Sequence, residues 1–397
     1  MKSFGVNINS IAFRYYLFTF FGGLAFYSAV LVPFYTDWGG ITLFQVQFLQ
    51  SWLMVWSIIF DIPTGIFADK FSRKYSVALG SVITFIATVI YGLVPSFGAF
   101  LFAELLTGLG MALISGAGEA LLYDSLDENN KQEEAKRVFG RAFSISQIAS
   151  VGAAIAGGYI ASKFGLNAPM LFSAVSFLLA GLVILTVAEP KIHRKIEHKM
   201  NMFISFKQGL TFFVQHKMLR LLVLDAVLVQ LGAYFLIWMY QPMLKNLGVP
   251  IENFGYIRAI FSLAAIVVTA NLLFTEKAFR SLSNFYIITA IITTVVLLSV
   301  GFFPNLIVLM IAIVLIGGFG QARYSSLNTF MHQYIPTENR ATVLSGISTF
   351  VRLMFIIFNP IVGFIADRSL QGAFIFVELL SAVVLIFPLL NKNYRYH

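Results

Sequence analysis

Ionisable side chains are rare inside the long apolar stretches of this sequence, and those that occur are the first candidates for chemistry. Six of them are Asp61, Glu104, Glu119, Asp225, Arg323 and Arg352. In a hydrocarbon environment such groups are costly, and they commonly mark substrate pathways, proton relays or ion pairs. A carboxyl group can bind and release a proton, and a guanidinium can hold a carboxylate or an anionic ligand.

Catalytic and metal-binding patterns are absent from the sequence. The chain has no cysteine, and none of its five histidines has a metal-ligand spacing on a helix face. No G-x-x-x-x-G-K-(S/T) loop is present to cradle a nucleotide phosphate. We therefore expect no enzyme, no catalytic residue, no metal and no cofactor.

The composition indicates an all-α polytopic membrane protein. Of the 397 residues, 58% are hydrophobic and only 11% are charged, whereas soluble domains carry about 25% charged residues. Apolar runs of about 20 residues recur along the chain, and backbone groups in hydrocarbon must pair within their own helix. The net charge of +9 is attributed to cytoplasmic loops rather than to nucleic-acid binding. The first apolar run is too long for a signal peptide and is expected to span.

Twelve transmembrane helices are expected, in two pseudo-symmetric six-helix bundles. The ranges are 11–34, 43–68, 75–94, 98–123, 138–161, 169–188, 219–244, 254–274, 284–303, 306–330, 342–366 and 372–391. The polar segment 189–217 divides an N-terminal bundle (1–188) from a C-terminal bundle (218–397). Its basic cluster fits either anionic-lipid binding or a plain cytoplasmic linker.

Lysine and arginine are unevenly distributed between the two sets of loops. With the N-terminus inside, the outer loops hold only Lys163, Lys245 and Arg368. This asymmetry predicts that both termini and segment 189–217 are cytoplasmic.

A faint internal repeat supports two halves related as parallel repeats. With a shift of about 205 residues, 158–165 (GYIASKFG) lies on 363–370 (GFIADRSL). With a shift of 207 residues, Asp69 and Arg73 align with Glu276 and Arg280. Chance similarity between apolar sequences is the alternative.

The segment 61–74, DIPTGIFADKFSRK, resembles the loop between helices 2 and 3 of the major facilitator superfamily of membrane transporters. The family pattern is G-x-x-x-D-(R/K)-x-G-(R/K)-(R/K), with Ser72 here in place of its second glycine. The matching residues are Gly65, Asp69, Lys70, Arg73 and Lys74. The resemblance implies the major facilitator fold and a secondary transporter that works by alternating access.

The same resemblance implies a gating role for this loop in the outward-open state. Its acid, Asp69, would face the N-terminal end of the eleventh span, and its arginine would pair with an acid at the inner end of the fourth. The acid available there is Asp124, so we predict an Arg73–Asp124 pair. The alternative is that these are solvated loop charges.

The fourth span carries Glu104, Gly108, Ala112, Ser115 and Glu119 on one helix face. Its first part resembles the R-x-x-x-G-x-G-x-A motif of proton-linked drug exporters, but Glu104 replaces the arginine. The role of that arginine is therefore not carried over. Glu104 fits either protonation or simple solvation near the outer end.

In the superfamily, helices 1, 4, 7 and 10 line the central cavity, which favours a Glu119–Arg323 pair across it. Separate local partners are the alternative, and Asp225 competes for Arg323. Arg352 needs a partner or an anionic ligand. Asp61 fits proton or substrate handling, or structural pairing. Glu378, in the twelfth span, is expected to be structural.

The preferred function is proton-coupled efflux, by an antiporter of the inner (cell) membrane, of a small hydrophobic or amphipathic compound. The alternative is proton-linked uptake of an organic, perhaps anionic, solute. A non-transporting sensor or an intramembrane enzyme is a third interpretation. The expected partners are a small-molecule substrate, protons and membrane lipid, and the protein is expected to be a monomer. The G-P-x-x-G-G motif of exporters is reduced here to AAIAGG (153–158).

Overall fold

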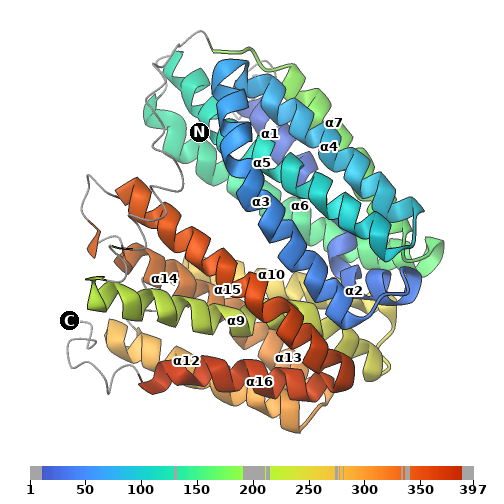
Figure 1. Ribbon diagram of the computed structural model, residues 1–397, viewed down its shortest axis with the longest axis vertical. Coiled ribbons are helices and arrows are strands. Elements are labelled where there is room, and N and C mark those ends of the chain that lie inside the picture. The colour runs from blue at the N-terminus through green and yellow to red at the C-terminus, as the bar shows by residue number, and fades with distance from the viewer. Residues whose placement is uncertain are drawn as a thin grey trace, which may run out of the picture. The chain divides into compact units, whose positions relative to one another are not determined.

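The architecture was obtained as a computed structural model, and the described residues form helices without strands (Figure 1). The described residues are 11–128, 132–190, 211, 215–272, 276, 278–279, 281–331, 334–335 and 340–386. Most of the predicted linker and the basic residues Lys277 and Arg280 lie outside them.

The helical elements before the central segment are α1 (Ile11–Gly23), η1 (Phe26–Ala29), α2 (Leu31–Pro33), η2 (Phe34–Trp38), α3 (Leu43–Lys70), α4 (Arg73–Leu93), α5 (Phe97–Glu128), η3 (Gln132–Glu134), α6 (Ala135–Phe164) and α7 (Ala168–Leu185). Those after it are α9 (Lys217–Asn246), η4 (Ile251–Asn253), α10 (Phe254–Ala270), α12 (Leu282–Phe302), α13 (Leu306–Leu315), η5 (Ile316–Gly320), α14 (Gln321–Met331), α15 (Arg340–Arg368), α16 (Leu370–Ala382) and η8 (Val383–Ile386).

Within the described residues, ten helices are long and apolar enough to cross a membrane. A bent pair, Ile11–Ala29 with Leu31–Trp38, makes eleven if it counts as one span. A shorter apolar helix, Leu370–Leu385, lies in the range predicted for the twelfth span. Each of the twelve predicted ranges therefore holds helix.

The chain folds into two compact units. The first contains residues 1–41, 52–199 and 251–256, and the second contains 42–51, 200–250 and 257–397. The first turns of α3 thus belong to the second unit, and the start of α10 belongs to the first.

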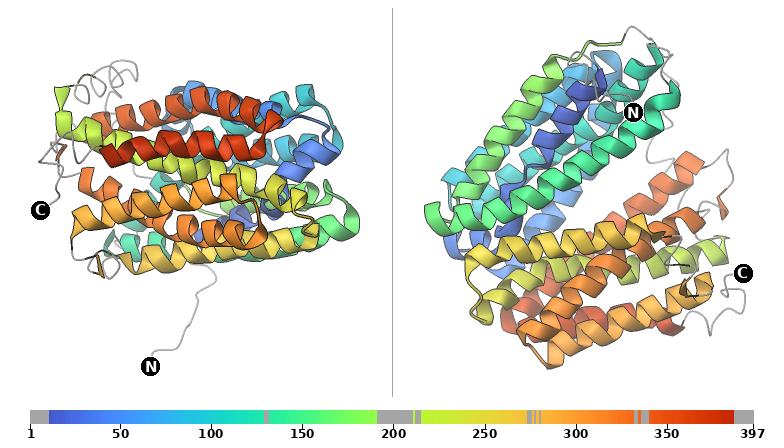
Figure 2. Two further views of the ribbon diagram at one scale, coloured as in Figure 1. Left: turned by 90° about the horizontal axis from the view of Figure 1, so that it is seen from below. Right: turned by 180° about the vertical axis from the view of Figure 1, so that it is seen from behind.

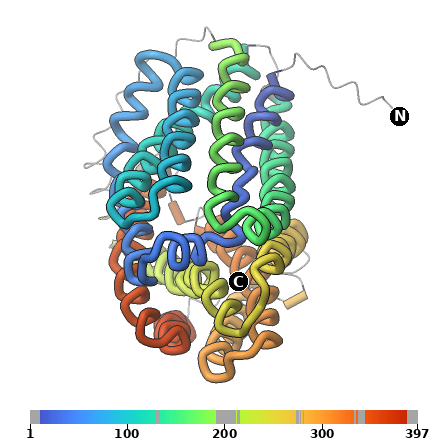
Figure 3. The backbone as a smooth tube through the Cα atoms, turned by 90° about the vertical axis from the view of Figure 1, so that its right-hand side faces the viewer, coloured from blue at the N-terminus to red at the C-terminus, as the bar shows by residue number. Residues whose placement is uncertain are grey.

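The first span is broken, and its two parts meet at an angle of 67° (Figure 3). The regular helix α1 stops at Gly23, and a 3-10 turn follows from Phe26. Gly157 of α6 lies directly against the backbone of Phe26, where a Cβ atom would overlap the carbonyl group. Glycine at this position lets α6 pack tightly against the break.

The tenth predicted span is interrupted by the π-helical turn η5. Three glycines occur in this turn, and two of them face α10: a Cβ atom on Gly317 would lie 2.9 Å from the Phe261 carbonyl oxygen, and one on Gly318 would lie 2.8 Å from Val268. π-turns inside helices are frequent at functional sites. This one directly precedes the helix that carries Arg323.

Each unit has its own apolar core. Val77, Leu121, Leu122 and Ile184 are fully buried in the first unit, where α4 packs between α5 and α7. The core of the second unit contains Leu219, Leu222, Phe285, Ala322 and Leu327. Views from below and behind show α12 and α16 running side by side in this unit (Figure 2).

Alanine substitutions on α6 test the tight contact at the helix break. Gly157→Ala is expected to lower the unfolding temperature of the detergent-solubilised protein, because its Cβ atom collides with the rigid backbone of Phe26. Gly152→Ala, on the same helix with nothing within 4 Å, is the matched control and gains up to about 1 kcal/mol of helix propensity. Equal unfolding temperatures would contradict the close packing.

Candidate functional site

The predicted Arg73–Asp124 pair is present at the turn between α3 and α4. Arg73 Nη1 donates a hydrogen bond to Asp124 Oδ2, and Nη2 lies 3.8 Å from Asp69 Oδ1. The Asp124 side chain is 3% exposed and that of Arg73 is 19% exposed. Ser72, in place of the family glycine, caps α4 by accepting a hydrogen bond from the Tyr75 amide at 3.1 Å. The turn thus ties the end of α3 to α5.

Glu189 also holds this turn, and the sequence analysis did not single it out. Its carboxylate accepts hydrogen bonds from the amides of Arg73 (2.9 Å) and Lys74 (3.0 Å), and from Ser72 Oγ (2.7 Å). The first amides of a helix lack partners within the helix, and the helix dipole favours an anion there. Glu189 therefore joins the beginning of the central segment to the turn between α3 and α4. An acid shortly after the sixth span is the only sequence signal for it.

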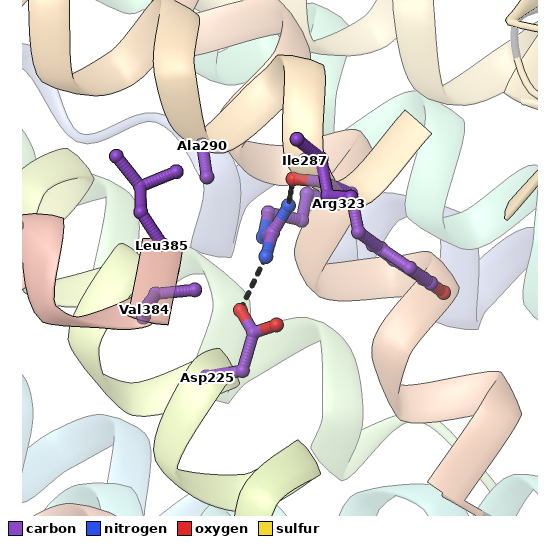
Figure 4. A pocket seen from close by; sticks show the side chains of 7 residues that line it. Asp225, Ile287, Ala290, Arg323, Val384 and Leu385 are labelled. Carbon is purple, nitrogen blue, oxygen red and sulfur yellow. Dashed lines mark hydrogen bonds and ion pairs between the residues drawn. The ribbon is translucent and has the colours of Figure 1, made fainter. Parts of the chain in front are cut away.

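A buried ion pair joins Asp225 of α9 to Arg323 of α14 (Figure 4). Asp225 is 0% exposed and Arg323 is 1% exposed. Arg323 Nη2 donates to Asp225 Oδ1, and Nη1 donates to the Tyr286 carbonyl oxygen and to Thr289 Oγ1, the latter at 2.8 Å. Both charged residues lie eight positions from a helix end, about 12 Å along the axis. The guanidinium thus connects three helices of the second unit.

Within the second unit Arg323 is bound by Asp225, the acid expected to compete with Glu119 for it. Glu119 is exposed on α5 and acts electrostatically on Tyr15 of α1. Asp61 and Arg352 are half-buried. A sequence pattern places residues at a depth in a helix, but the rotation of each helix decides which charges meet.

A small cavity of about 20 Å³ adjoins the ion pair. Its lining includes Asp225, Arg323, Tyr286, Val384 and Leu385. The buried Arg323 Nε has no hydrogen-bond partner among the described residues. The volume is about that of one water molecule, and most of the lining surface is apolar.

A hydrogen-bonded chain runs from the Tyr286 hydroxyl to Glu276, a residue between α10 and α12. The Tyr286 hydroxyl lies 2.7 Å from Ser326 Oγ, and Ser326 Oγ donates to Glu276 Oε1. The Arg323 guanidinium also lies over the Tyr286 ring, 5.2 Å from its centroid. The loop acid and the buried ion pair are thus parts of one polar network.

Glu104 of α5 is 4% exposed and lies in an aromatic cluster. Tyr35 donates a hydrogen bond of 3.2 Å to Glu104 Oε1. Tyr91 and Phe100 pack against Tyr35 with ring centroids 5.9 Å and 5.4 Å away. Burial argues against simple solvation of Glu104, and its protonation stays a prediction.

Asp367, at the end of α15, binds the start of α3. Its two carboxylate oxygens accept hydrogen bonds from the amides of Leu43 (2.7 Å) and Phe44 (3.1 Å). Gly363 makes the approach tight, since a Cβ atom there would lie 2.8 Å from Phe44 Cα. The signal for Asp367 was in the sequence: GFIADR (363–368) has the same G-x-x-x-D-(K/R) pattern as GIFADK (65–70).

Three comparisons with known proteins agree with this architecture. The sequence profile of the Major Facilitator Superfamily matches residues 15–304. MFS-type transporter YxaM of Bacillus subtilis is 24% identical over 238 residues, which span 59% of this chain and 58% of that protein. MFS-type transporter MJ1560 of Methanocaldococcus jannaschii is 19% identical over 376 residues, 92% of this chain and 94% of that protein.

Among solved structures, a variant of the nucleoside transporter NupG has a TM-score of 0.80 at 14% identity. The match covers 96% of this chain and 99% of NupG. At this identity the likeness shows the fold alone. The chain belongs to the Major Facilitator Superfamily, and it is a multi-pass membrane transporter rather than an enzyme. Among the described residues, no group of three or more metal-ligating side chains gathers.

A double-mutant cycle tests the buried ion pair. Asp225→Leu and Arg323→Met are each expected to destabilise the protein by about 3–5 kcal/mol, because each leaves a buried charge without its partner. Combining Asp225→Leu with Arg323→Met should cost less than the sum of the single changes. This difference between the double variant and the sum of the single variants is measured from unfolding free energies in mixed micelles. The Arg73–Asp124 pair, whose arginine is partly exposed, is the control and should couple more weakly, whereas additive effects at Asp225 and Arg323 would exclude the buried pair.

Replacing Asp367 tests the contact with α3. Asp367→Ala is expected to speed hydrogen–deuterium exchange of the amides at 43–44 about fivefold, since losing a helix cap costs about 1 kcal/mol. Asp367→Asn keeps one oxygen acceptor and should have a smaller effect. Arg368→Ala, at the next position, is the control. Unchanged exchange in the alanine variant would show that the carboxylate does not protect these amides.

Proposed function

We propose that this transporter is a proton-coupled exporter of a small hydrophobic or amphipathic compound. It works by alternating access in the cell membrane, with both termini in the cytoplasm. The observation that carries the proposal is the Glu104 carboxyl, buried among aromatic rings with the Tyr35 hydroxyl bound to it. A carboxyl in such surroundings favours its neutral form and can exchange a proton when water reaches it.

The proposed substrate class is supported by aromatic side chains on the spanning helices. Trp52, Trp56 and Phe60 follow one another along α3, with centroid distances of 5.5 Å and 5.2 Å. On α9, the ring of Tyr234 lies 4.5 Å from that of Phe355. Binding sites for small organic molecules are mostly apolar and aromatic, with a few polar groups.

Gating is assigned to two sets of carboxylate contacts at helix ends. One is the turn formed by Gly65, Asp69, Lys70, Arg73 and Lys74, which Asp124 and Glu189 hold in place. The other is Asp367 with the start of α3. Carboxylates at helix N-termini make contacts that are strong in one conformation and are lost by a small displacement, which suits a switch.

The alternative, uptake of an anionic solute, is less well supported. It requires free cationic side chains to attract the substrate, and Arg323 is already neutralised by Asp225. Arg352 is the remaining candidate, and it too has interactions within the chain.

Liposomes with a pH-sensitive dye inside test the proposal. Drugs, sugars, amino acids and metabolites are first screened for compounds that raise the unfolding temperature, because ligands stabilise the native state. Entry of a hydrophobic or amphipathic hit should raise the luminal pH if protons leave in exchange, and Glu104→Gln should reduce this change. Luminal acidification would favour the uptake alternative, and no pH change in the wild type would remove proton coupling.

A further inference from the structure

A second buried carboxyl, Glu378, lies in α16 where this helix packs against α9 and α12. The residue is 0% exposed. Neither of its carboxyl oxygens has a hydrogen-bond partner among the described residues. Thr294 of α12 lies beside this carboxyl without making a hydrogen bond of normal geometry to it. The expectation of a structural residue does not account for a carboxyl group in this position.

Hydroxyl side chains extend from Glu378 towards the Asp225–Arg323 pair. Ser381, one turn along α16, donates a hydrogen bond of 2.7 Å to the Leu228 carbonyl oxygen of α9. Thr293 faces the same part of α9: a Cβ atom on Gly232 would lie 3.5 Å from both Ser381 Oγ and Thr293 Cγ2. One turn below Thr293, Thr289 accepts a hydrogen bond from Arg323.

The end of this helix also borders the cavity beside the ion pair. Val384 and Leu385, which follow α16 in η8, line the cavity together with Asp225 and Arg323. A water-sized space therefore lies at one end of the polar row, and Glu378 lies at the other.

The protonation state of Glu378 follows from its surroundings. An ionised carboxylate removed from water without a compensating partner is so unfavourable that the group takes up a proton instead. Two buried acids of the same unit thus have different surroundings: Asp225 is paired with Arg323, whereas neither Glu378 oxygen has a hydrogen-bond partner among the described residues. Buried acids with different environments are the usual arrangement for moving a proton.

We propose that Glu378 is a proton-binding site of the second unit, neutral in this conformation, which exchanges its proton with water that reaches it from the side of the cavity at the Asp225–Arg323 pair. As a coupling site it rests on the proposed proton-driven transport. Its proton occupancy does not depend on that proposal and can be measured separately.

Other ionisable groups on the elements packed against α16 are accounted for. The buried ones among the described residues are Asp225 and Tyr240 of α9 and Tyr286 of α12. On α15, Arg352 is half-buried and Asp367 is bound to the start of α3. The described part of η8 contains only Val383–Ile386, none of which titrates.

Infrared spectroscopy of the purified full-length protein tests proton occupancy without a substrate. At neutral pH the wild type should show the carbonyl band of a protonated carboxylic acid, and Glu378→Gln should lose one carboxyl's share of it. Glu134→Gln, at an exposed acid, is the matched control and should keep the full band. Glu104→Gln separates the contribution of the other buried glutamate. An unchanged band in Glu378→Gln would overturn the proposal.

Reconstituted liposomes test coupling with a compound from the thermal-shift screen. Glu378→Gln mimics the neutral acid, so it should fold, bind the compound and exchange it across the membrane, but lose the substrate-linked proton movement. Wild-type proton movement in this variant would overturn the coupling role even if the infrared band is lost. Absence of proton movement in the wild type would instead refute the proposed function and the coupling role, while the infrared result would still decide whether Glu378 holds a proton.

Discussion

The structure depends on the absence of water around its spanning helices. In hydrocarbon every backbone N–H and C=O group must be paired within the chain, so each predicted span consists mainly of helix, with a break in the first one. The same constraint acts on side chains. Asp225 and Arg323 are buried together, and Glu104 is bound by a tyrosine hydroxyl. Each of these contacts replaces solvation that the membrane cannot provide.

At helix ends, backbone N–H and C=O groups have no partner within the helix. In this protein, carboxylate side chains bind some of these N–H groups. Glu189 binds the first amides of α4, and Asp367 binds those of α3. Both acids come from a distant part of the sequence, so each contact fixes one segment against another. Gly363 allows the close approach that the second contact requires. Because a helix terminus combines unpaired donors with a favourable dipole, a single carboxylate there is an effective connection.

Features that depend on a local sequence pattern, such as the spans and the Arg73–Asp124 pair, could be predicted from the sequence. Apolar runs located every span, and the loop motif identified Arg73 and Asp124 as partners, since both lie at helix ends on the same side. The partner of Arg323 was not decided, because its depth matched both Glu119 and Asp225 and only helix rotation separates them. Glu189 carried almost no signal. Asp367 did carry one, the recurrence of the G-x-x-x-D-(K/R) pattern, but the contact joins residues more than 300 positions apart.

The location of the ion pair also affects which acids are free to exchange protons. Asp225 is paired with Arg323 inside the second unit, and removing either charge would leave the other buried without its partner. Glu104 lies in its aromatic cluster with the Tyr35 hydroxyl bound to it, and Glu378 lies beside Thr294. The proposed proton exchange is therefore assigned to these two carboxyls, which pack between helices, rather than to Asp225.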